Sequence, residues 1–343
     1  MPSELDAGRL FARLVHHRLL LALAPSLRPH LQEADARELT DMEQRGLKGS
    51  LGRIGGMLQL LGSFKESAIP VLTFKGAAYG AQIMGDPVRR GGIDIDLLVP
   101  PKEGNRASDL LLSLGYRPAG PAEWKSQTFV SSAMPQVDLH THIAAQAEVL
   151  SALHPFEHMT FVNIAGMQVP TLAPEDAIVY AAYHGIRHAW ARLHWAFDLA
   201  VALDNPAVDW SKVSTRAHAL RCERHLAAAL GFAAATFNRR QPPGFVAMTP
   251  LTSAVRPVVE AHLAHLAQPP TERGMRETAP LRHLLVEMRL HRSWRERWQI
   301  LSAHIAPAEE DLATLHLPAG LRFLYLPVKV LRILKRKHRL RRP

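Results

Sequence analysis

Two aspartates in an apolar, β-branched run constrain this chain more than any other feature. The run is Ile93-Asp94-Ile95-Asp96-Leu97-Leu98-Val99. Residues two apart on a strand point to the same face of a sheet, so Asp94 and Asp96 are expected to lie side by side. Neighbouring carboxylates repel each other, and a divalent cation relieves that repulsion because hard cations prefer carboxylate oxygen. The run therefore predicts a metal-binding strand.

Two further segments complete a pattern around this strand. Val71 to Phe74 is typical of a strand, and it runs into a turn at Lys75-Gly76-Ala77 that opens a helix. Gln136-Val137-Asp138-Leu139-His140 is a later alternating strand that carries a third acidic residue. A glycine turn, an Asp-x-Asp strand and a later single aspartate together indicate metal-dependent phosphoryl or nucleotidyl transfer.

Length and composition allow a soluble globular protein with two domains, or one core with an extension. The chain has 343 residues, of which 47% are hydrophobic and 21% charged. Its single cysteine, Cys222, excludes an internal disulfide framework and a cysteine-rich zinc site, and it fits a reducing compartment. Charged residues interrupt the apolar N-terminal region, so we expect no signal peptide and no transmembrane helix. A cytoplasmic location follows from these expectations.

The net charge of +10 is concentrated at the C-terminus. Residues 321–343 contain nine lysines or arginines and no acid, while the rest of the chain has 32 basic and 31 acidic residues. A nearly neutral body argues against nucleic acid as a substrate, because tracking a phosphate backbone needs a basic surface. The basic, amphipathic tail is open to three interpretations: a docked last helix with a solvated end, peripheral contact with the inner membrane face, or binding of an acidic partner or nucleic acid.

The pattern of segments predicts an α/β (α+β) fold with a small mixed β-sheet core. We expect a helical N-terminal segment over residues 1–66, the core over 67–172, a largely helical C-terminal domain over 173–320 and the tail over 321–343. Further strands are expected near Thr128 to Ser131 and Val137 to Ile143, and a hairpin turns at Ala165-Gly166. Helical spacing covers 77–84 and 105–114. The N-terminal helices are expected to break near Pro25 to Pro29 and around Gly46 to Gly56.

The C-terminal half begins with a clear helix start. Pro174-Glu175-Asp176 places proline and acids in the first turn, and the helical run extends to Leu203 before Asn205-Pro206 stops it. Further helices are expected from Asp209, over 221–240, over 254–304 and over 321–340.

An ordered set of motifs carries a resemblance to a known family. In the core they are Lys75-Gly76-Ala77, Tyr79, Arg90, the strand from Asp94 to Val99, and Val137-Asp138-Leu139-His140. In the helical half they are Pro174-Glu175-Asp176, His184, Arg187-His188-Ala189-Trp190, Leu193-His194-Trp195, Asp198-Leu199-Ala200 and Asp209-Trp210. Over about residues 68 to 245 the chain resembles the polymerase-β-like nucleotidyltransferase superfamily, and within it a bacterial family of uncharacterised nucleotidyltransferases.

The resemblance implies roles for the core residues. Asp94, Asp96 and Asp138 would hold the catalytic metals, two Mg²⁺ with Mn²⁺ as an alternative, and Asp138 would help to deprotonate an acceptor hydroxyl. Gly76 would let backbone N–H groups approach phosphate. Lys75 or Arg90 would neutralise the leaving pyrophosphate. Arg90 is the preferred candidate, and Arg89 is its neighbouring alternative. Ala77 departs from the Gly-Ser or Gly-Gly turn of better-characterised members, so the hydroxyl that would touch a phosphate is absent.

Other residues form a possible acceptor site or support the catalytic residues. His140 shares a strand face with Asp138, and it would bind that carboxylate or a phosphate, or serve only as a structural histidine. His184 and His188 are four residues apart on one helix, but no third ligand in a zinc-like pattern accompanies them, so a polar cleft face is favoured over a zinc site. Trp195 would help to position an acceptor or pack in the core. Asp198 needs a partner, which Arg187 or Arg192 could supply.

The sequence therefore predicts a nucleotidyltransferase that moves a nucleoside monophosphate from an NTP, with ATP as the default donor, to an acceptor hydroxyl. The acceptor could be a small molecule, a saccharide, a peptide or a protein side chain, in a specialised biosynthetic or tailoring pathway. A catalytically reduced nucleotide-binding or regulatory module of the same fold is the alternative, which the missing hydroxyl at Ala77 favours.

Overall fold

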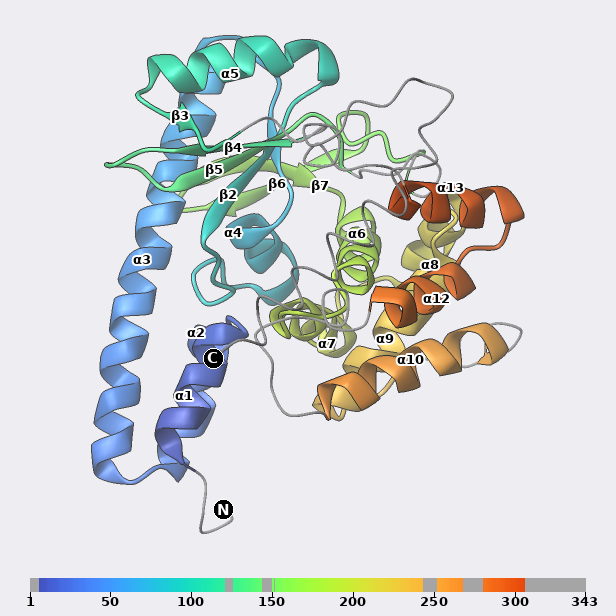
Figure 1. The fold of residues 1–343 in the computed structure, drawn as a ribbon. Coiled ribbons are helices and arrows are strands. Elements are labelled where there is room, and N and C mark those ends of the chain that lie inside the picture. The colour runs from blue at the N-terminus through green and yellow to red at the C-terminus, as the bar shows by residue number, and fades with distance from the viewer. Residues whose placement is uncertain are drawn as a thin grey trace, which may run out of the picture. The chain divides into compact units, whose positions relative to one another are not determined.

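A computed structural model describes residues 6–120, 126–143, 150, 152–242, 252–267 and 280–305 of the chain (Figure 1). The chain divides into two compact units, one from Met1 to Leu290 and one from His291 to Pro343. The expected domain divisions at 66/67 and 172/173 fall within the first unit and stay predictions.

A five-stranded mixed sheet forms the core of the first unit. Its strands are β1 (Leu72–Thr73), β2 (Asp94–Leu98), β3 (Arg117–Pro118), β4 (Ser126–Val130) and β5 (Gln136–His140), in the spatial order β1-β2-β5-β4-β3. Strands β2 and β5 run parallel, whereas the other neighbouring pairs run antiparallel. The mixed sheet among many helices confirms the predicted fold class, although the two-residue strand β3 was not among the strands predicted.

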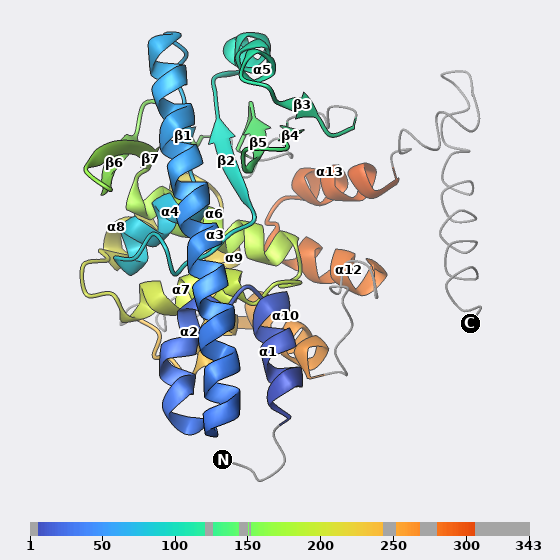
Figure 2. The same cartoon turned by 90° about the vertical axis from the view of Figure 1, so that its left-hand side faces the viewer.

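Alternation along β2 and β5 gives the sheet one apolar face and one polar face. Ile95 and Leu97 of β2, with Val137 and Leu139 of β5, are buried in a cluster that also contains residues of α3 (Glu33–Glu66) and α5 (Gly104–Ser113). The intervening residues, which include all three aspartates of the predicted site, occupy the opposite face. Figure 2 shows α3 running along the sheet.

Helix α3 is continuous over 34 residues, about 50 Å, so the expected break around Gly46 to Gly56 is wrong. The glycines serve close packing instead. A Cβ atom on Gly46 would lie 2.7 Å from Leu21 Cδ2, and one on Gly56 would lie 2.9 Å from Pro135 Cδ. Contact with neighbouring segments thus outweighs the weak helix propensity of glycine.

Two shorter helices pack against α3. Helices α1 (Ala7–His16) and α2 (Leu20–Leu27) share a buried cluster with Leu39 of α3. Pro25 lies inside α2, and the chain leaves the α-helix at a 3₁₀ turn, η1 (Arg28–His30), before α3 begins. A break close to Pro29 is therefore confirmed.

The helical half of the first unit shares one buried cluster with the sheet. It consists of α6 (Pro174–Arg187), α7 (His194–Asp204), α8 (Trp210–Ala219), α9 (Glu223–Phe237), α10 (Thr252–Leu266) and α12 (Pro280–Leu290). Leu72 and Leu98 of the sheet belong to the same cluster as the buried side chains of α6 and α9. The polar face of the sheet is thus the side on which these helices pack.

The expected helical run from Pro174 to Leu203 is broken between α6 and α7. Ala189 and Trp190 adopt left-handed backbone angles, with φ of 49° and 52°. Their conformation folds the Trp190 side chain back over Gly185 and stacks it on Phe232 at a centroid distance of 4.9 Å. Burial of this ring against α9 favours the break. The sequence has no glycine or proline at positions 189 and 190 that would indicate it.

Two smaller elements flank the sheet. Strands β6 (Met159–Ile164) and β7 (Met167–Leu172) form the predicted hairpin, with Ala165 and Gly166 in left-handed conformations at its turn. Helix α4 (Gly76–Tyr79) follows β1 and continues as a π-helical turn, η2 (Gly80–Met84).

In the second unit, the described residues form α13 (Trp294–Ile305). Ser293 and Glu296 exchange hydrogen bonds with each other's backbone N–H at its start, which is a capping box. The basic tail, and with it the helix expected over 321–340, lies outside the described residues. No helix among the described residues has the length and apolarity needed to cross a bilayer.

The fold around Trp190 can be tested through Gly185. We expect Gly185→Ala to lower the free energy of unfolding by about 1–3 kcal/mol or more, because its Cβ would enter the space of the Trp190 ring. Gly52→Ala is the matched control on exposed α3 surface, where no atom lies within 4 Å of the new Cβ, and a gain of about 0.5–1 kcal/mol is expected. Urea unfolding of both variants checks this, and equal stabilities would contradict the packing.

Candidate functional site

A cavity of about 520 Å³ opens between the polar face of the sheet and the helices α6 and α7. Asp94, Asp96 and Asp138 lie on its sheet side, and Tyr180, His184 and Trp195 lie on its helical side. The structure therefore places all three predicted acids in one cavity.

The register of β2 and β5 explains this convergence. In the parallel pair, Asp94 lies opposite Gln136, and Asp96 lies directly opposite Asp138. Because side chains at paired positions of adjacent strands point to the same face, the two carboxylates project together over the cavity. Residues more than forty positions apart in the chain thus become neighbours.

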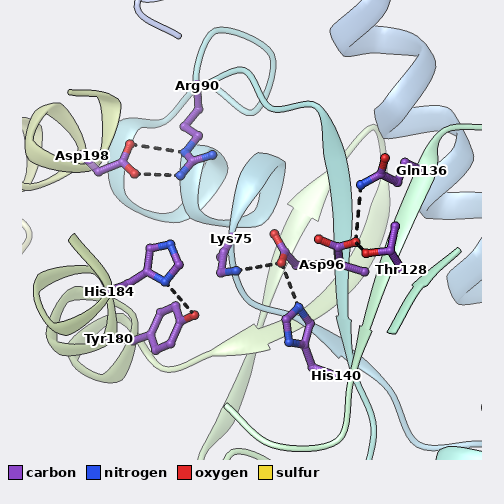
Figure 3. Close-up of polar contacts among 10 residues, drawn as sticks. Lys75, Arg90, Asp96, Thr128, Gln136, His140, Tyr180, His184 and Asp198 are labelled. Carbon is purple, nitrogen blue, oxygen red and sulfur yellow. Dashed lines mark hydrogen bonds and ion pairs between the residues drawn. The ribbon is translucent and has the colours of Figure 1, made fainter. Parts of the chain in front are cut away.

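Asp96 is the best-supported carboxylate of the site (Figure 3). Its Oδ1 accepts a hydrogen bond from Lys75 Nζ at 2.7 Å and lies 3.1 Å from His140 Nε2. Burial favours the neutral acid, but the Lys75 ammonium and the His140 imidazole outweigh it and hold the pKa of Asp96 well below its usual range. Asp96 is therefore ionised despite being only 8% exposed.

Asp138 is oriented by its own neighbours. Its Oδ1 accepts hydrogen bonds from Thr128 Oγ1 at 2.8 Å and from Gln136 Nε2 at 3.4 Å. Thr128 is on β4, directly opposite Asp138 in the antiparallel ladder. These two donors fix the carboxylate with one oxygen engaged.

Asp94 differs from the other two acids because no described residue forms a hydrogen bond or ion pair with its carboxylate. Burial, followed by the charges of Asp96 and Asp138, raises the pKa of Asp94. Three carboxylates on one face repel each other, and a bound cation would remove that penalty.

The donor set fits a divalent cation. Asp96, Asp138 and His140 offer ligand atoms that all lie within 4.8 Å of one another. Carboxylate oxygens suit Mg²⁺ and Mn²⁺, and an imidazole is tolerated better by Mn²⁺. Asp94 lies outside this set, so the structure groups two of the predicted metal ligands with His140.

The turn after β1 borders a second, smaller cavity, which Asp94 and Asp96 also line. Gly76 and Ala77 line it together with Gly91 and Gly92, and Lys75 is shared with the large cavity. Gly76 has φ of +52°, and no atom lies within 4 Å of the position a Cβ would take. The backbone there is open to a ligand.

Arg90 occupies a different environment from the one predicted. Its Nε and Nη2 bind the two carboxylate oxygens of Asp198 on α7 at 3.3 and 2.8 Å, and the two residues are 7% and 3% exposed (Figure 3). Asp198 therefore pairs with Arg90, and the expected partners Arg187 and Arg192 are wrong. The pair joins the loop before β2 to the helical half.

Histidines and aromatic rings line the helical side of the cavity. The centroid of the His184 ring lies 4.4 Å from that of His188 and 5.0 Å from that of Trp195. The Tyr180 hydroxyl forms a hydrogen bond with His184 Nδ1 at 3.3 Å. Burial lowers the pKa of His184 well below its usual range, so the imidazole is neutral. This wall combines aromatic ring faces with the neutral imidazole of His184.

The structure adds residues that the sequence did not single out for the site. Thr128 and Gln136 orient Asp138, Tyr180 contacts His184, and Arg18 and Arg53 line the cavities from the N-terminal helices. Gln136 and Thr128 could have been found by pairing the predicted strands. Arg18 and Arg53 carry no local signal, because their place depends on how α1 and α3 pack.

A family model described as an uncharacterised nucleotidyltransferase matches residues 3–238. A search of curated proteins found no match. The family match thus extends from the N-terminal helices through the sheet to α9.

Solved structures with some likeness include two of the antibiotic-resistance factor ANT(2'')-Ia. The solution structure is 19% identical with a TM-score of 0.40, covering 49% of this chain and 90% of that one. The complex with adenylyl-2''-tobramycin is 20% identical with a TM-score of 0.32, covering 50% and 92%. Lincomycin-bound LnuA, a lincosamide antibiotic adenylyltransferase, is 12% identical with a TM-score of 0.28, covering 36% and 83%.

The buried Arg90–Asp198 pair predicts a large stability effect. Arg90→Gln leaves the Asp198 carboxylate buried without its partner, and we expect a loss of about 3–5 kcal/mol in the free energy of unfolding. The double variant Arg90→Gln, Asp198→Asn is expected to recover part of the loss, because no charge then remains buried. Urea unfolding measures both. Unchanged stability of Arg90→Gln would contradict a stabilising role for the pair.

Proposed function

This chain belongs to the family of uncharacterised nucleotidyltransferases, and we propose that it transfers a nucleoside monophosphate from an NTP to a hydroxyl group of an acceptor. ATP is the default donor, and pyrophosphate is the second product. The observation that carries the proposal is the pairing of Asp96 with Asp138 across parallel strands, with Asp94 on the same face.

The carboxylates are suited to hold the metal that such a transfer needs. Asp94, Asp96 and Asp138 would bind Mg²⁺, with Mn²⁺ as an alternative, and His140 lies within reach of the same position. A bound divalent cation would neutralise phosphate charge and stabilise the attacking and leaving oxygens.

The proposed chemistry is an in-line displacement at the α-phosphorus. The acceptor oxygen forms a bond to that phosphorus as the bond to the bridging oxygen of the β-phosphate breaks, and the electron pair leaves with pyrophosphate. Asp138 would take the acceptor proton. Thr128 and Gln136 engage its Oδ1, which leaves the other carboxylate oxygen for that proton.

Lys75 and His140 would keep Asp96 ionised while the donor binds. Lys75 is held over the ring of Phe74, at 5.0 Å from its centroid, and near Tyr180, at 5.9 Å. This packing places the ammonium at the boundary of the two cavities, beside the turn at Gly76 and Ala77. Lys75 can therefore contact a phosphate there without leaving Asp96.

The large cavity is the proposed acceptor site. Its helical wall of His184, His188 and Trp195 offers ring faces and the neutral imidazole of His184, which suit a small molecule or a saccharide ring. A peptide or protein side chain remains a second class of acceptor, and nucleic acid is disfavoured by the nearly neutral body. A specialised biosynthetic or tailoring reaction is the setting that these features favour.

We also propose a cytoplasmic location, with contact at the inner membrane face through the basic residues of 321–343. Vesicle sedimentation of the full chain, with and without anionic lipid, tests the contact, since a polybasic segment binds anionic surfaces.

A catalytically reduced binding module is the competing function. In that case Ala77 would mark a turn that binds nucleotide without completing transfer. Titration calorimetry with Mg²⁺ and ATP, on the wild type and on Asp94→Asn/Asp96→Asn, separates the two when it is combined with a pyrophosphate assay. Metal-dependent binding of ATP without pyrophosphate release would favour the module.

Removal of single carboxylates tests the transfer directly. We expect Asp96→Asn and Asp138→Asn each to reduce transfer by about 10³-fold or more, because each removes charge that positions metal and nucleophile. The assay incubates protein with α-phosphate-labelled NTPs and cell extract and identifies labelled products by mass spectrometry. Chelation should abolish labelling and added Mg²⁺ or Mn²⁺ restore it.

Asp109→Asn is a control for charge removal, because Asp109 is an exposed acid on α5. Retention of labelling by either site variant at the level of this control would overturn the proposed roles of the carboxylates.

A further inference from the structure

The two cavities are lined by buried or partly buried cations of two kinds. Lys75, Arg90 and Arg187 each face a carboxylate: Asp96 at 2.7 Å, Asp198 at 2.8 Å and Glu287 at 3.6 Å. Arg18 in the large cavity and Arg53 in the small one have no hydrogen bond or ion pair to any residue that the structure describes. These two guanidiniums are partly desolvated without a partner.

The electrostatics separate the two kinds in the same way. Burial lowers the pKa of Lys75 and Arg90, but the neighbouring Asp96 and Asp198 reverse this and raise the pKa of each above its usual value. At Arg18 and Arg53 burial dominates, and the pKa of each guanidinium is lowered. The Asp94 carboxylate partly offsets this by raising the pKa of both arginines, yet it lies beyond ion-pair distance of either.

The backbone at Arg18 adopts a left-handed conformation. Arg18 has φ of +57° directly after α1, where glycine is the usual residue. The Arg18 N–H donates a hydrogen bond to Val15 O, and the Leu19 N–H donates one to Leu14 O. This turn places Leu19 in the buried cluster of the N-terminal helices. This hydrogen-bonded turn places the Arg18 side chain on the large cavity.

Arg53 is presented by an anchored part of α3. Ser50 Oγ donates to Val88 O at 2.7 Å, and Arg89 Nη1 binds Glu43 Oε1 at 2.7 Å. Both contacts tie α3 to the segment that leads into β2. The Arg53 side chain is therefore held on the small cavity beside the glycine turn.

We propose that Arg18 and Arg53 form a polyphosphate-binding site, through which the N-terminal helices hold the β- and γ-phosphates of the donor. The inference rests on the proposed function for the identity of the donor, and it gives the helices of residues 1–66 a part in the site. Guanidinium groups suit this ligand because they bind phosphate oxygens through two parallel donors. It also assigns the pyrophosphate role expected of Arg90 to residues that are not already paired.

The test measures binding of Mg²⁺-tripolyphosphate by calorimetry, which requires neither an acceptor nor turnover. We expect Arg18→Gln and Arg53→Gln each to weaken binding about tenfold, the factor that corresponds to 1.4 kcal/mol. Arg18→Lys and Arg53→Lys should recover part of the affinity. Arg13→Gln on α1 and Arg45→Gln on α3 are matched controls, because both arginines are exposed, and their affinities should stay within about twofold of the wild type.

Thermal unfolding of the same variants separates ligand binding from a structural role. Removing a desolvated charge that lacks a partner should leave the melting temperature equal or higher, whereas removing a structural ion pair should lower it. Affinities of Arg18→Gln and Arg53→Gln within about twofold of the controls, or absence of tripolyphosphate binding by the wild type, would overturn the inference.

The two proposals fail separately. If the wild type binds tripolyphosphate through both arginines but transfers no labelled nucleotide, the anion site stands and the transfer activity does not. If labelled products form while binding is indifferent to both arginines, the site proposed here is wrong and the transfer activity stands.

Discussion

The parallel pairing of β2 with β5 is the constraint on which the site depends. Its register sets Asp96 opposite Asp138, and strand alternation places Asp94 on the same face. A shift of one residue would move Asp138 to the apolar face, among Val137 and Leu139, and bury a carboxylate without a partner. The apolar residues of these strands therefore fix the acids as firmly as they fix the core. Stability and chemistry share one register.

Charge matching then divides the cations around the acids by role. Lys75 is committed to Asp96 and Arg90 to Asp198, so both stabilise the folded site and its connection to α7. Buried ion pairs of this kind are costly to break from one side, which makes them poor candidates for residues that must exchange partners during a reaction cycle. An arginine without a carboxylate partner is better suited to bind an anion that associates and dissociates during the reaction cycle. The location of unmatched charge is thus more informative about ligands than the location of charge itself.

Sequence patterns predicted what depends on local alternation and short-range chemistry. The strands with Asp94, Asp96 and Asp138, the Gly76 turn and the hairpin at Ala165-Gly166 all have periodicity or turn residues that announce them. Patterns failed where tertiary contacts overrule propensity. Gly46 and Gly56 lie within a continuous helix because Leu21 and Pro135 approach them, and the break before α7 depends on burial of Trp190 against Phe232. The partner of Asp198 was missed because Arg90 is 108 residues away in the chain.

The break before α7 also has a consequence for the acceptor side of the cavity. One continuous helix would separate positions 184 and 195 by about 16 Å along its axis, because each residue adds about 1.5 Å. The left-handed residues 189 and 190 end α6 and let α7 return, so that the ring centroids of His184 and Trp195 lie 5.0 Å apart. The same turn buries Trp190 and brings Asp198 to Arg90. A break that packing favours therefore assembles the helical wall and attaches it to the loop before β2, so the geometry of the proposed acceptor site follows from core burial rather than from local sequence preference.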